Sequence, residues 1–440
     1  MPVKIDGKVE YSKSEQECLN FLRSPTLLGD VKEELDYTII GEEQNKLSMF
    51  LLCLSKDFDP QAIYLMGSSS AGKSYLINQV LGFFPDDCIE KFTRSSTHGL
   101  EYLLKDKDMN GKILVIQEAL GGEQAEGSLR PMISKDQQGL RIVTVDFNRQ
   151  AKVLNIKGCP VYITSTADVD VEHQMTTRVW FLSPDESEEQ TREILKYQAK
   201  KVSSLVDIES KKKELIKNAI KLLKPYKIIV CYAEKLQDKF PTNKVKYRRD
   251  FEKLLTLVKC SAHLYQYQRK TENGILYASI TDLVNALGVA RNILKQTLMG
   301  LPDISIRILN TIKEMESDDI FKGNITHQTI AGKMDLAEGT IRRYIQPLWV
   351  EGYVTRDESI RPYKYSITTV NNPITSLLTV TNNFGDFFSE KEFNRWLSDH
   401  CYSVTKCSVC YQDINPFAHT SNSNTVTLAK EGVKSEIQTR

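Results

Sequence analysis

Residues 67–74 read GSSSAGKS and lie between the apolar runs AIYLM and YLINQVL. The stretch fits the pattern G-x-x-x-x-G-K-[ST], with Gly67, Gly72, Lys73 and Ser74 in the fixed places. The glycines let the backbone curl so that its N–H groups converge on phosphate oxygens, and the lysine brings a positive charge to the same anion. A helix that begins here points the positive end of its dipole at the phosphates. The stretch therefore predicts a strand, a phosphate-binding loop and a helix.

The flanking sequence supports this interpretation. Residues 62–66 are typical of a short buried strand, and Leu76, Ile77, Val80 and Leu81 recur at helical spacing on one face. The alternative is a turn rich in Gly and Ser that binds nothing. We expect the loop to bind ATP or GTP together with Mg²⁺, which the Ser74 hydroxyl would help to hold.

Nine consecutive residues are the expected nucleotide contacts, and Lys73 is also expected to act in catalysis. They are Gly67, Ser68, Ser69, Ser70, Ala71, Gly72, Lys73, Ser74 and Tyr75.

Length and composition set limits on the rest of the chain. A chain of 440 residues has room for two or three domains, and 41% apolar with 26% charged residues is ordinary for a globular protein. The formal net charge of +1 argues against a globally basic nucleic-acid coat, so any DNA-binding surface must be local. The sequence has no apolar stretch of 18 residues and no signal peptide at its start, so we expect a cytoplasmic protein without membrane contact.

The nine cysteines are an odd number without a secretion signal, which favours reduced thiols. One cluster, CYSVTKCSVC, holds Cys401, Cys407 and Cys410. Its C-x-x-C could supply half of a zinc site, but no second C-x-x-C or spaced histidine pair completes one. Metal binding and a disordered tail that carries thiols both remain open for this cluster.

Pattern shifts along the chain predict an α/β P-loop NTPase core, an α-helical lid and a C-terminal winged-helix module. The expected boundaries are a helical segment at 1–45, the core at 46–185, the lid at 186–270, the winged module at 271–370, and a disordered tail rich in Ser, Thr and Asn at 371–440.

A catalytic acid is expected at the end of a second strand of the core. KILVIQE predicts a strand at residues 113–116, followed by Gln117 and Glu118. Glu118 is the candidate that holds Mg²⁺ through water and polarises the attacking water. Glu123 is a possible substitute, and a surface glutamate is the alternative for Glu118.

The next segment, LRIVTVDFNRQAKVLNIKG, has two β-rich arms around a polar centre, which predicts a hairpin. Arg149 and Lys152 lie near its tip. A basic tip suits the phosphates of DNA, and a merely solvated tip is equally compatible with the pattern.

A third apolar strand, in GCPVYITSTAD, ends in Thr164, Ser165 and Thr166. A hydroxyl there, Thr166 in particular, could sense the γ-phosphate and align the water. About a dozen residues later, Arg178 precedes another apolar strand and could reach the ATP of a neighbouring subunit. The alternative for Arg178 is an ordinary surface position.

The segment from 326 to 368 predicts a helix, a turn, a second helix and a two-stranded wing. The second helix carries Arg342, Arg343 and Tyr344, which are the candidate DNA contacts, and Arg356 and Lys364 flank the wing. Winged helices also dock on proteins, so this alternative remains open.

This order of motifs resembles the AAA+ ATPases, in particular the branch with a hairpin before sensor 1, which includes the minichromosome maintenance and superfamily III helicases. A closer resemblance, over about residues 40 to 270 and more loosely to 370, is to the helicase-type ATPase part of mobile-element and phage primase–helicase proteins of bacteria and archaea. The segments that carry it are IIGEEQNKLSMFLLCLS, GSSSAGKSYLINQVLGFFP, KILVIQE, GCPVYITST, TTRVWFLSPDESEEQTREI and RRDFEKLLTLVKCSAHLYQYQR.

The resemblance implies an ATP-hydrolysing DNA helicase or translocase that serves replication of a mobile element. It implies a homo-oligomer, with a hexamer as one candidate, in which Arg178 is an arginine finger in trans. The partners would be single-stranded DNA in the ring, duplex DNA at the winged helix and a separate primase, since only about 40 residues precede the ATPase part.

The sequence departs from the family pattern at one position, and some assignments keep alternatives. Ala119 stands where the family commonly has a second glutamate, so the assignment of the catalytic acid stays open. RRDFEKLL falls where related lids carry a second sensor arginine, which implicates Arg249 with Arg248 as its neighbour; a salt-bridged helix start is the alternative. An ATP-switched DNA-binding regulator without motor activity and a P-loop kinase for a small molecule are the other function classes.

Overall fold

The computed structural model describes residues 3–5, 8–93, 102–117, 139–145, 150–166, 178–203, 212–240, 242, 245–299, 301–321 and 323–368. All of them belong to one compact unit that spans residues 1–381. The tail predicted at 371–440, with its cysteine cluster, lies outside the described residues.

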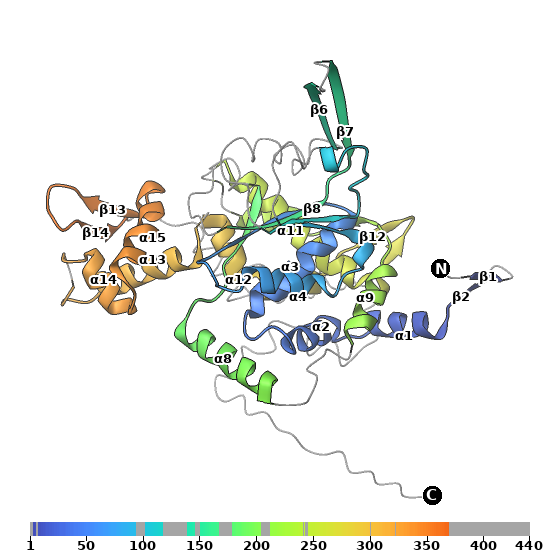
Figure 1. Ribbon diagram of the computed structural model, residues 1–440, viewed down its shortest axis with the longest axis horizontal. Helices are drawn as coiled ribbons and strands as arrows, with labels where there is room; N and C mark the ends of the chain where they lie inside the picture. Colours follow the sequence, from blue (N-terminus) through green and yellow to red (C-terminus); the bar gives the residue numbers. More distant parts are fainter. Residues whose placement is uncertain are drawn as a thin grey trace, which may run out of the picture. The chain divides into compact units, whose positions relative to one another are not determined.

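A parallel sheet of five strands forms the centre of the protein (Figure 1). Its order is β4-β5-β8-β3-β9, so β8 separates β3 from β5. Every residue of β3, β5 and β9 is buried, as expected for a parallel sheet covered on both faces. The strands are β3 (Ala62–Met66), β4 (Ile89–Phe92), β5 (Ile113–Ile116), β8 (Val161–Thr166) and β9 (Val179–Leu182). The bounds predicted for β3 and β5 from sequence are confirmed.

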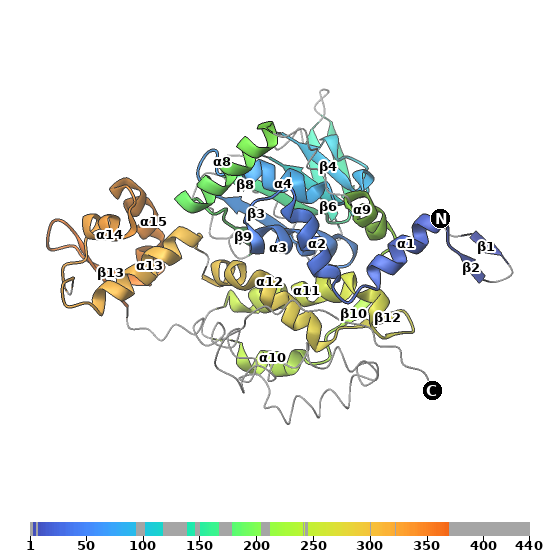
Figure 2. The same ribbon diagram turned by 90° about the horizontal axis from the view of Figure 1, so that it is seen from below.

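The N-terminal segment contributes a short hairpin and three helices. The third of these helices, α3, is buried on almost every side because it packs against α4, α11 and α12 (Figure 2). The elements are β1 (Val3–Ile5), β2 (Lys8–Glu10), α1 (Lys13–Leu22), α2 (Leu27–Asp36), α3 (Glu43–Leu54) and the 3-10 turn η1 (Ser55–Asp57). After β3 come α4 (Lys73–Leu81) and η2 (Asp86–Cys88).

The predicted hairpin is confirmed and projects away from the sheet (Figure 1). It consists of β6 (Gly139–Val145) and β7 (Ala151–Lys157), paired antiparallel. Its base is anchored, because Leu154 and Ile156 are buried and the backbone of Lys157 exchanges hydrogen bonds with that of the 107–109 segment. Farther out, Val143 is 71% exposed. The residues 146–149 at the tip, Arg149 among them, lie outside the described part of the chain.

The region expected to be a purely helical lid also contains a strand. β10 (Lys227–Ile229) pairs with β12 (Ile275–Tyr277), and β12 pairs with β11 (Thr271–Glu272). This small sheet joins segments on both sides of the expected boundary at residue 270. The helices of the region are α8 (Glu188–Ser203), α9 (Lys213–Lys221), α10 (Ala233–Lys239), α11 (Tyr247–Leu264), η3 (Gln266–Gln268) and α12 (Ile280–Met299).

The C-terminal elements follow the predicted order of helix, turn, helix and two strands. Thr326 caps the first of these helices, and Asp335 adopts a left-handed conformation (φ 53°) in the turn. An additional helix, α13, precedes them and packs on both. The elements are α13 (Asp303–Glu316), α14 (His327–Met334), α15 (Glu338–Val350), β13 (Val354–Asp357) and β14 (Lys364–Ile367).

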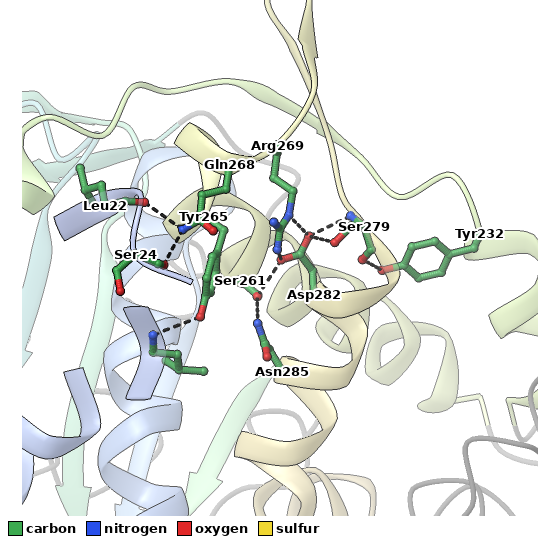
Figure 3. A network of polar contacts seen from close by, with 11 residues as sticks. Leu22, Ser24, Tyr232, Ser261, Tyr265, Gln268, Arg269, Ser279, Asp282 and Asn285 are labelled. Carbon is green, nitrogen blue, oxygen red and sulfur yellow. Dashed lines mark hydrogen bonds and ion pairs between the residues drawn. The ribbon is translucent and has the colours of Figure 1, made fainter. Parts of the chain in front are cut away.

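A buried polar network ties α11, α12 and the small sheet together (Figure 3). Asp282 is fully buried and accepts hydrogen bonds from Nε and Nη2 of Arg269 at 2.8 and 2.7 Å. It also accepts from the backbone N–H of Ser279 at 2.8 Å and from the hydroxyl of Ser261 at 2.9 Å. Burial disfavours the charged guanidinium, but the charge and hydrogen bonds of Asp282 outweigh this and raise the pKa of Arg269.

The same neighbourhood anchors the N-terminal helices. Tyr265 accepts a hydrogen bond from the backbone N–H of Leu28 at 3.1 Å, and Gln268 donates to the carbonyls of Leu22 and Ser24 at 3.0 and 2.8 Å (Figure 3). The helices that begin the chain are thereby fixed to the turn that follows α11.

We predict that Asp282→Ala lowers the free energy of unfolding by about 3–5 kcal/mol, because it leaves the Arg269 guanidinium buried without its partner. Chemical denaturation followed by circular dichroism measures this. The matched control is Asp238→Ala, since Asp238 is an exposed residue of α10 and should change stability by less than about 0.5 kcal/mol. Equal effects of the two substitutions would contradict the structural role of the network.

Candidate functional site

The phosphate-binding loop has the backbone geometry that its sequence predicts. β3 ends at Met66, α4 begins at Lys73, and Gly72 holds a left-handed conformation (φ 81°) at the start of the helix. The apolar face predicted for α4, Leu76, Ile77, Val80 and Leu81, is buried. The N-terminus of α4, with Ser74 in its first turn, therefore faces the space that the loop encloses.

The ammonium of Lys73 lies against the first residues of the loop. It donates to the carbonyls of Gly67 and Ser68 at 3.0 and 2.6 Å. Burial lowers the pKa of Lys73, and the charge of Glu186 acts in the opposite direction. The lysine is thus held at the loop by backbone oxygens, where it can bind an anion.

The end of β8 joins this loop to the expected catalytic acid. The backbone carbonyl of Thr166 accepts a hydrogen bond from the backbone N–H of Gly67 at 3.3 Å, and the hydroxyl of Ser165 donates to the carbonyl of Gln117 after β5. The structure thereby brings the end of β8, with its predicted hydroxyl residues, beside the start of the loop. Glu118 directly follows Gln117 in the sequence, but Glu118 and Glu123 lie outside the described residues.

A cavity of about 730 Å³ opens beside the loop. Its walls are residues 68–72 of the loop, residues 38–40 of the linker between α2 and α3 (residues 37–42), and one side of α8, where Leu195 is 59% exposed. A largely apolar space next to a phosphate-binding loop can accept the base and sugar of a nucleotide.

Three side chains hold the linker in place along this cavity. Tyr75 of α4 donates its hydroxyl to the carbonyl of Thr38 at 2.7 Å. From α8, Gln190 donates to the carbonyl of Ile40 at 2.6 Å, and Tyr197 donates to that of Tyr37 at 3.1 Å. Tyr75, expected as a nucleotide contact, therefore lines the cavity and also fixes its wall.

A fully buried lysine also holds the linker in place. The ammonium of Lys46 in α3 forms ion pairs with Asp36 and Glu43 and donates to the carbonyl of Gly41 at 2.7 Å. Sequence reasoning missed this residue. The signal for it was a single lysine among the apolar residues of the helix that begins at Glu43.

A short loop after β9, residues 183–187, forms the remaining edge of the site; we call it the strap. Asn45 donates to the carbonyl of Ser183 at 2.8 Å, and Glu42 accepts from the backbone N–H of Asp185 at 2.7 Å. Burial raises the pKa of Glu42. The next residue, Glu186, accepts from the backbone N–H of Ser68 at 2.5 Å. None of these contacts was expected from the sequence.

The two arginines expected to act on nucleotide lie away from the loop. Arg178 directly precedes β9, whose first residue, Val179, pairs with Ala62 at the start of β3. The loop follows the other end of β3, roughly 15 Å farther along the strand. Arg249 lies on α11 one turn before Lys253, which donates to the carbonyl of Val179 at 2.9 Å. The backbone of Arg178 therefore lies at the edge of the sheet opposite the loop, and α11, which carries Arg249, contacts the same edge through Lys253.

The expected DNA contacts have mixed surroundings. Lys152 is exposed on β7. Arg342 is exposed and forms an ion pair with Glu338 at 2.7 Å, and Arg343 lies with its guanidinium 5.6 Å from the ring of Tyr344. Tyr344 itself is only 8% exposed, so its ring packs inside the protein instead of facing outward with Arg342.

Within the described residues, no group of three or more His, Cys, Asp or Glu residues is arranged to hold a metal ion. Cys401, Cys407 and Cys410 lie outside this part of the chain. No helix in the same part of the chain combines the length and apolarity needed to cross a membrane.

We predict that Gly41→Ala weakens both the linker and nucleotide binding. Gly41 has φ 62°, and a Cβ atom there would meet the Gln190 side chain at 2.3 Å, so the substitution should lower stability by about 1–3 kcal/mol. Gly288→Ala is the control, because this exposed helical glycine has open space around its Cβ position and should gain up to about 1 kcal/mol. Thermal melts and nucleotide titrations compare the two; a Gly41→Ala protein that matches wild type in both would refute the account of the linker.

Comparison with known proteins agrees with this geometry. Residues 11–225 match the family described as the MTBMA_p00010 P-loop domain. The matched region runs from α1 through α9 and contains the loop and the whole parallel sheet. A comparison with curated proteins gave no match. The family match, the sheet and the loop together support an α/β P-loop NTPase domain at residues 11–225, a class of domain that binds nucleotides.

Proposed function

We propose that the protein is an ATP-hydrolysing DNA translocase or helicase of the AAA+ type that works as an oligomer. One observation carries the proposal. β8 lies between the strand that leads to the loop and the strand that leads to Glu118, and a hairpin that projects from the core enters immediately before β8 (Figure 1). The first feature supports hydrolysis, and the second supports contact with a strand of DNA.

The residues for ATP hydrolysis come from the carboxyl ends of β3, β5 and β8. The carbonyl of Thr166 accepts the backbone N–H of Gly67, and the hydroxyl of Ser165 donates to the carbonyl of Gln117, the residue before Glu118, so the end of β8 is joined to both the loop and the end of β5. Glu118 would polarise the attacking water, and Lys73 would neutralise charge on the phosphates. Ser74 and Glu118 offer the oxygen ligands that Mg²⁺ prefers, and the bound ion would stabilise the charge that develops on the phosphates.

The arginines support an oligomer. Arg178 lies at the edge of the sheet opposite the loop of its own chain, and α11, which carries Arg249, contacts the same edge. In a ring of identical subunits, that edge can face the loop of a neighbour, where a guanidinium would stabilise the transition state. A hexamer is one such ring.

Two surfaces would meet DNA. The hairpin presents Lys152 on its exposed side and would contact single-stranded DNA inside the ring. α14, α15 and the two strands β13 and β14 have the order of a winged helix, and Arg342 is exposed on α15 where it could contact duplex DNA. A separate primase would then act on the DNA that the protein unwinds, as expected for replication of a mobile element.

The order of the C-terminal elements also supports a second candidate, a DNA-binding regulator that switches with ATP and has no motor. Such a protein would bind duplex DNA through Arg342 and Arg343 but would not couple hydrolysis to strand displacement. The two candidates share the nucleotide site and differ in the role of the hairpin.

We predict that Lys73→Ala abolishes ATP turnover, because the ammonium at the loop is removed while the fold is kept. Steady-state phosphate release, with and without single-stranded DNA, measures this, and we expect stimulation by DNA in wild type only. Size-exclusion chromatography in ATP tests for the ring. Wild-type turnover in Lys73→Ala would disprove the assignment of the loop.

We further predict that replacing both Arg149 and Lys152 by Ala leaves basal hydrolysis largely intact and removes strand displacement and DNA stimulation. The backbone contacts that couple hydrolysis to movement would be lost, while the nucleotide site is unchanged. Lys13→Ala with Arg23→Ala is the control, because it removes the same charge from exposed positions on and beside α1. A wild type that hydrolyses ATP but displaces no strand would favour the regulator.

A further inference from the structure

The carboxylate of Glu186 lies directly on the phosphate-binding loop. Its Oε1 accepts the backbone N–H of Ser68 at 2.5 Å. A Cβ atom on Gly67 would be 2.8 Å from the same oxygen, so the glycine at the first fixed position of the motif makes room for this side chain. An acid in such close contact with an anion-binding loop requires an explanation, because nucleotides carry several negative charges.

The strap holds Glu186 there from both sides. On one side, the backbone N–H of Asp185 is bound by Glu42 at 2.7 Å. On the other side, the backbone N–H of Ser187 donates to Asp185 at 2.9 Å, and the hydroxyl of Ser187 accepts from the N–H of Gln190 at the start of α8. The backbone of Glu186 is thus fixed, while its side chain is exposed.

The charges around Glu186 come from three elements. Lys73 of α4 is close enough for Glu186 to oppose the lowering of its pKa by burial. On the strap and beside it lie the acids Asp185 and Glu42. From α15, Tyr344 has its pKa raised by burial, with a further contribution from the charge of Glu186.

The strap also lines a second cavity, of about 720 Å³. Glu186 lines both cavities. The second cavity is also lined by Arg307 of α13 and by Thr340 and Tyr344 of α15. A carboxylate that leaves the loop can therefore turn toward a guanidinium of the C-terminal elements.

We propose that Glu186 competes with the phosphates of the nucleotide for the loop, weakens nucleotide binding, and turns toward Arg307 when the phosphates bind. This rests on the proposed nucleotide binding and adds its regulation. The repulsion between a carboxylate and a polyphosphate at a partly exposed site changes affinity by about tenfold. The movement connects phosphate binding to α13 and α15.

The test measures the dissociation constants of Mg²⁺–ADP and Mg²⁺–ATP with the full chain. Glu186→Gln keeps the hydrogen-bond acceptor and removes the charge, and we expect it to bind both nucleotides about tenfold more tightly than wild type. This gain should shrink as salt is raised, because salt screens the repulsion. The control, Glu189→Gln, removes the same charge from an exposed position of α8 and should leave affinity unchanged.

Arg307→Ala tests the second half of the proposal. In wild type, its loss should weaken nucleotide binding several-fold, because the displaced carboxylate has no partner; in Glu186→Gln it should have no effect. Equal effects of Arg307→Ala in both backgrounds would overturn the movement toward α13.

Two further results are distinguishable. A Glu186→Gln protein that melts like wild type but binds nucleotide more weakly would show that Glu186 only supports the loop, and would overturn the competition. A wild type that binds neither nucleotide would instead overturn the proposed function on which the competition rests.

Discussion

The pairing of β8 with β3 on one side and with β5 on the other determines most of what the site can do. Parallel strands end at the same edge of a sheet, so this pairing brings the loop after β3, the hydroxyls of β8 and the segment after β5 to one place. The hydrogen bond from Gly67 to Thr166 and that from Ser165 to Gln117 join the three ends directly. A shift of β8 by one residue would turn Ser165 to the other face and remove it from Gln117.

The nucleotide cavity depends on charges placed inside the protein. Lys46 is fully buried, yet its ion pairs with Asp36 and Glu43 and its bond to the carbonyl of Gly41 replace the water that an ammonium loses on burial. The carboxylate of Glu42 holds the strap by accepting a hydrogen bond from the backbone N–H of Asp185. Loss of both acids would leave the buried Lys46 ammonium without an anionic partner, so this wall of the cavity is sensitive to substitution.

Local chemistry explains which features could be predicted from the sequence. The strands at 62–66 and 113–116, the helix from Lys73 and the hairpin each follow from a short run of residues, and all are confirmed. The pairing of β10 with β12 joins segments almost 50 residues apart and has no local signal. The same holds for the contact of Glu186 with Ser68, 118 positions away. Tyr344 shows the limit within a helix, because the helical pattern places it beside Arg343 but does not reveal what covers its ring.

The position of the arginines connects the fold to assembly. Because Val179 pairs with Ala62, Arg178 lies at the edge of the sheet where β3 begins. Its side chain is too short to reach along the whole strand to the loop. α11 is bound to the same edge through Lys253. If these residues act on ATP, the ATP is that of another subunit, and each subunit offers its loop on one edge and its arginines on the other. A contact between two different edges is heterologous, and such contacts close into rings or extend into filaments, so the proposed role of the arginines is incompatible with a symmetric dimer.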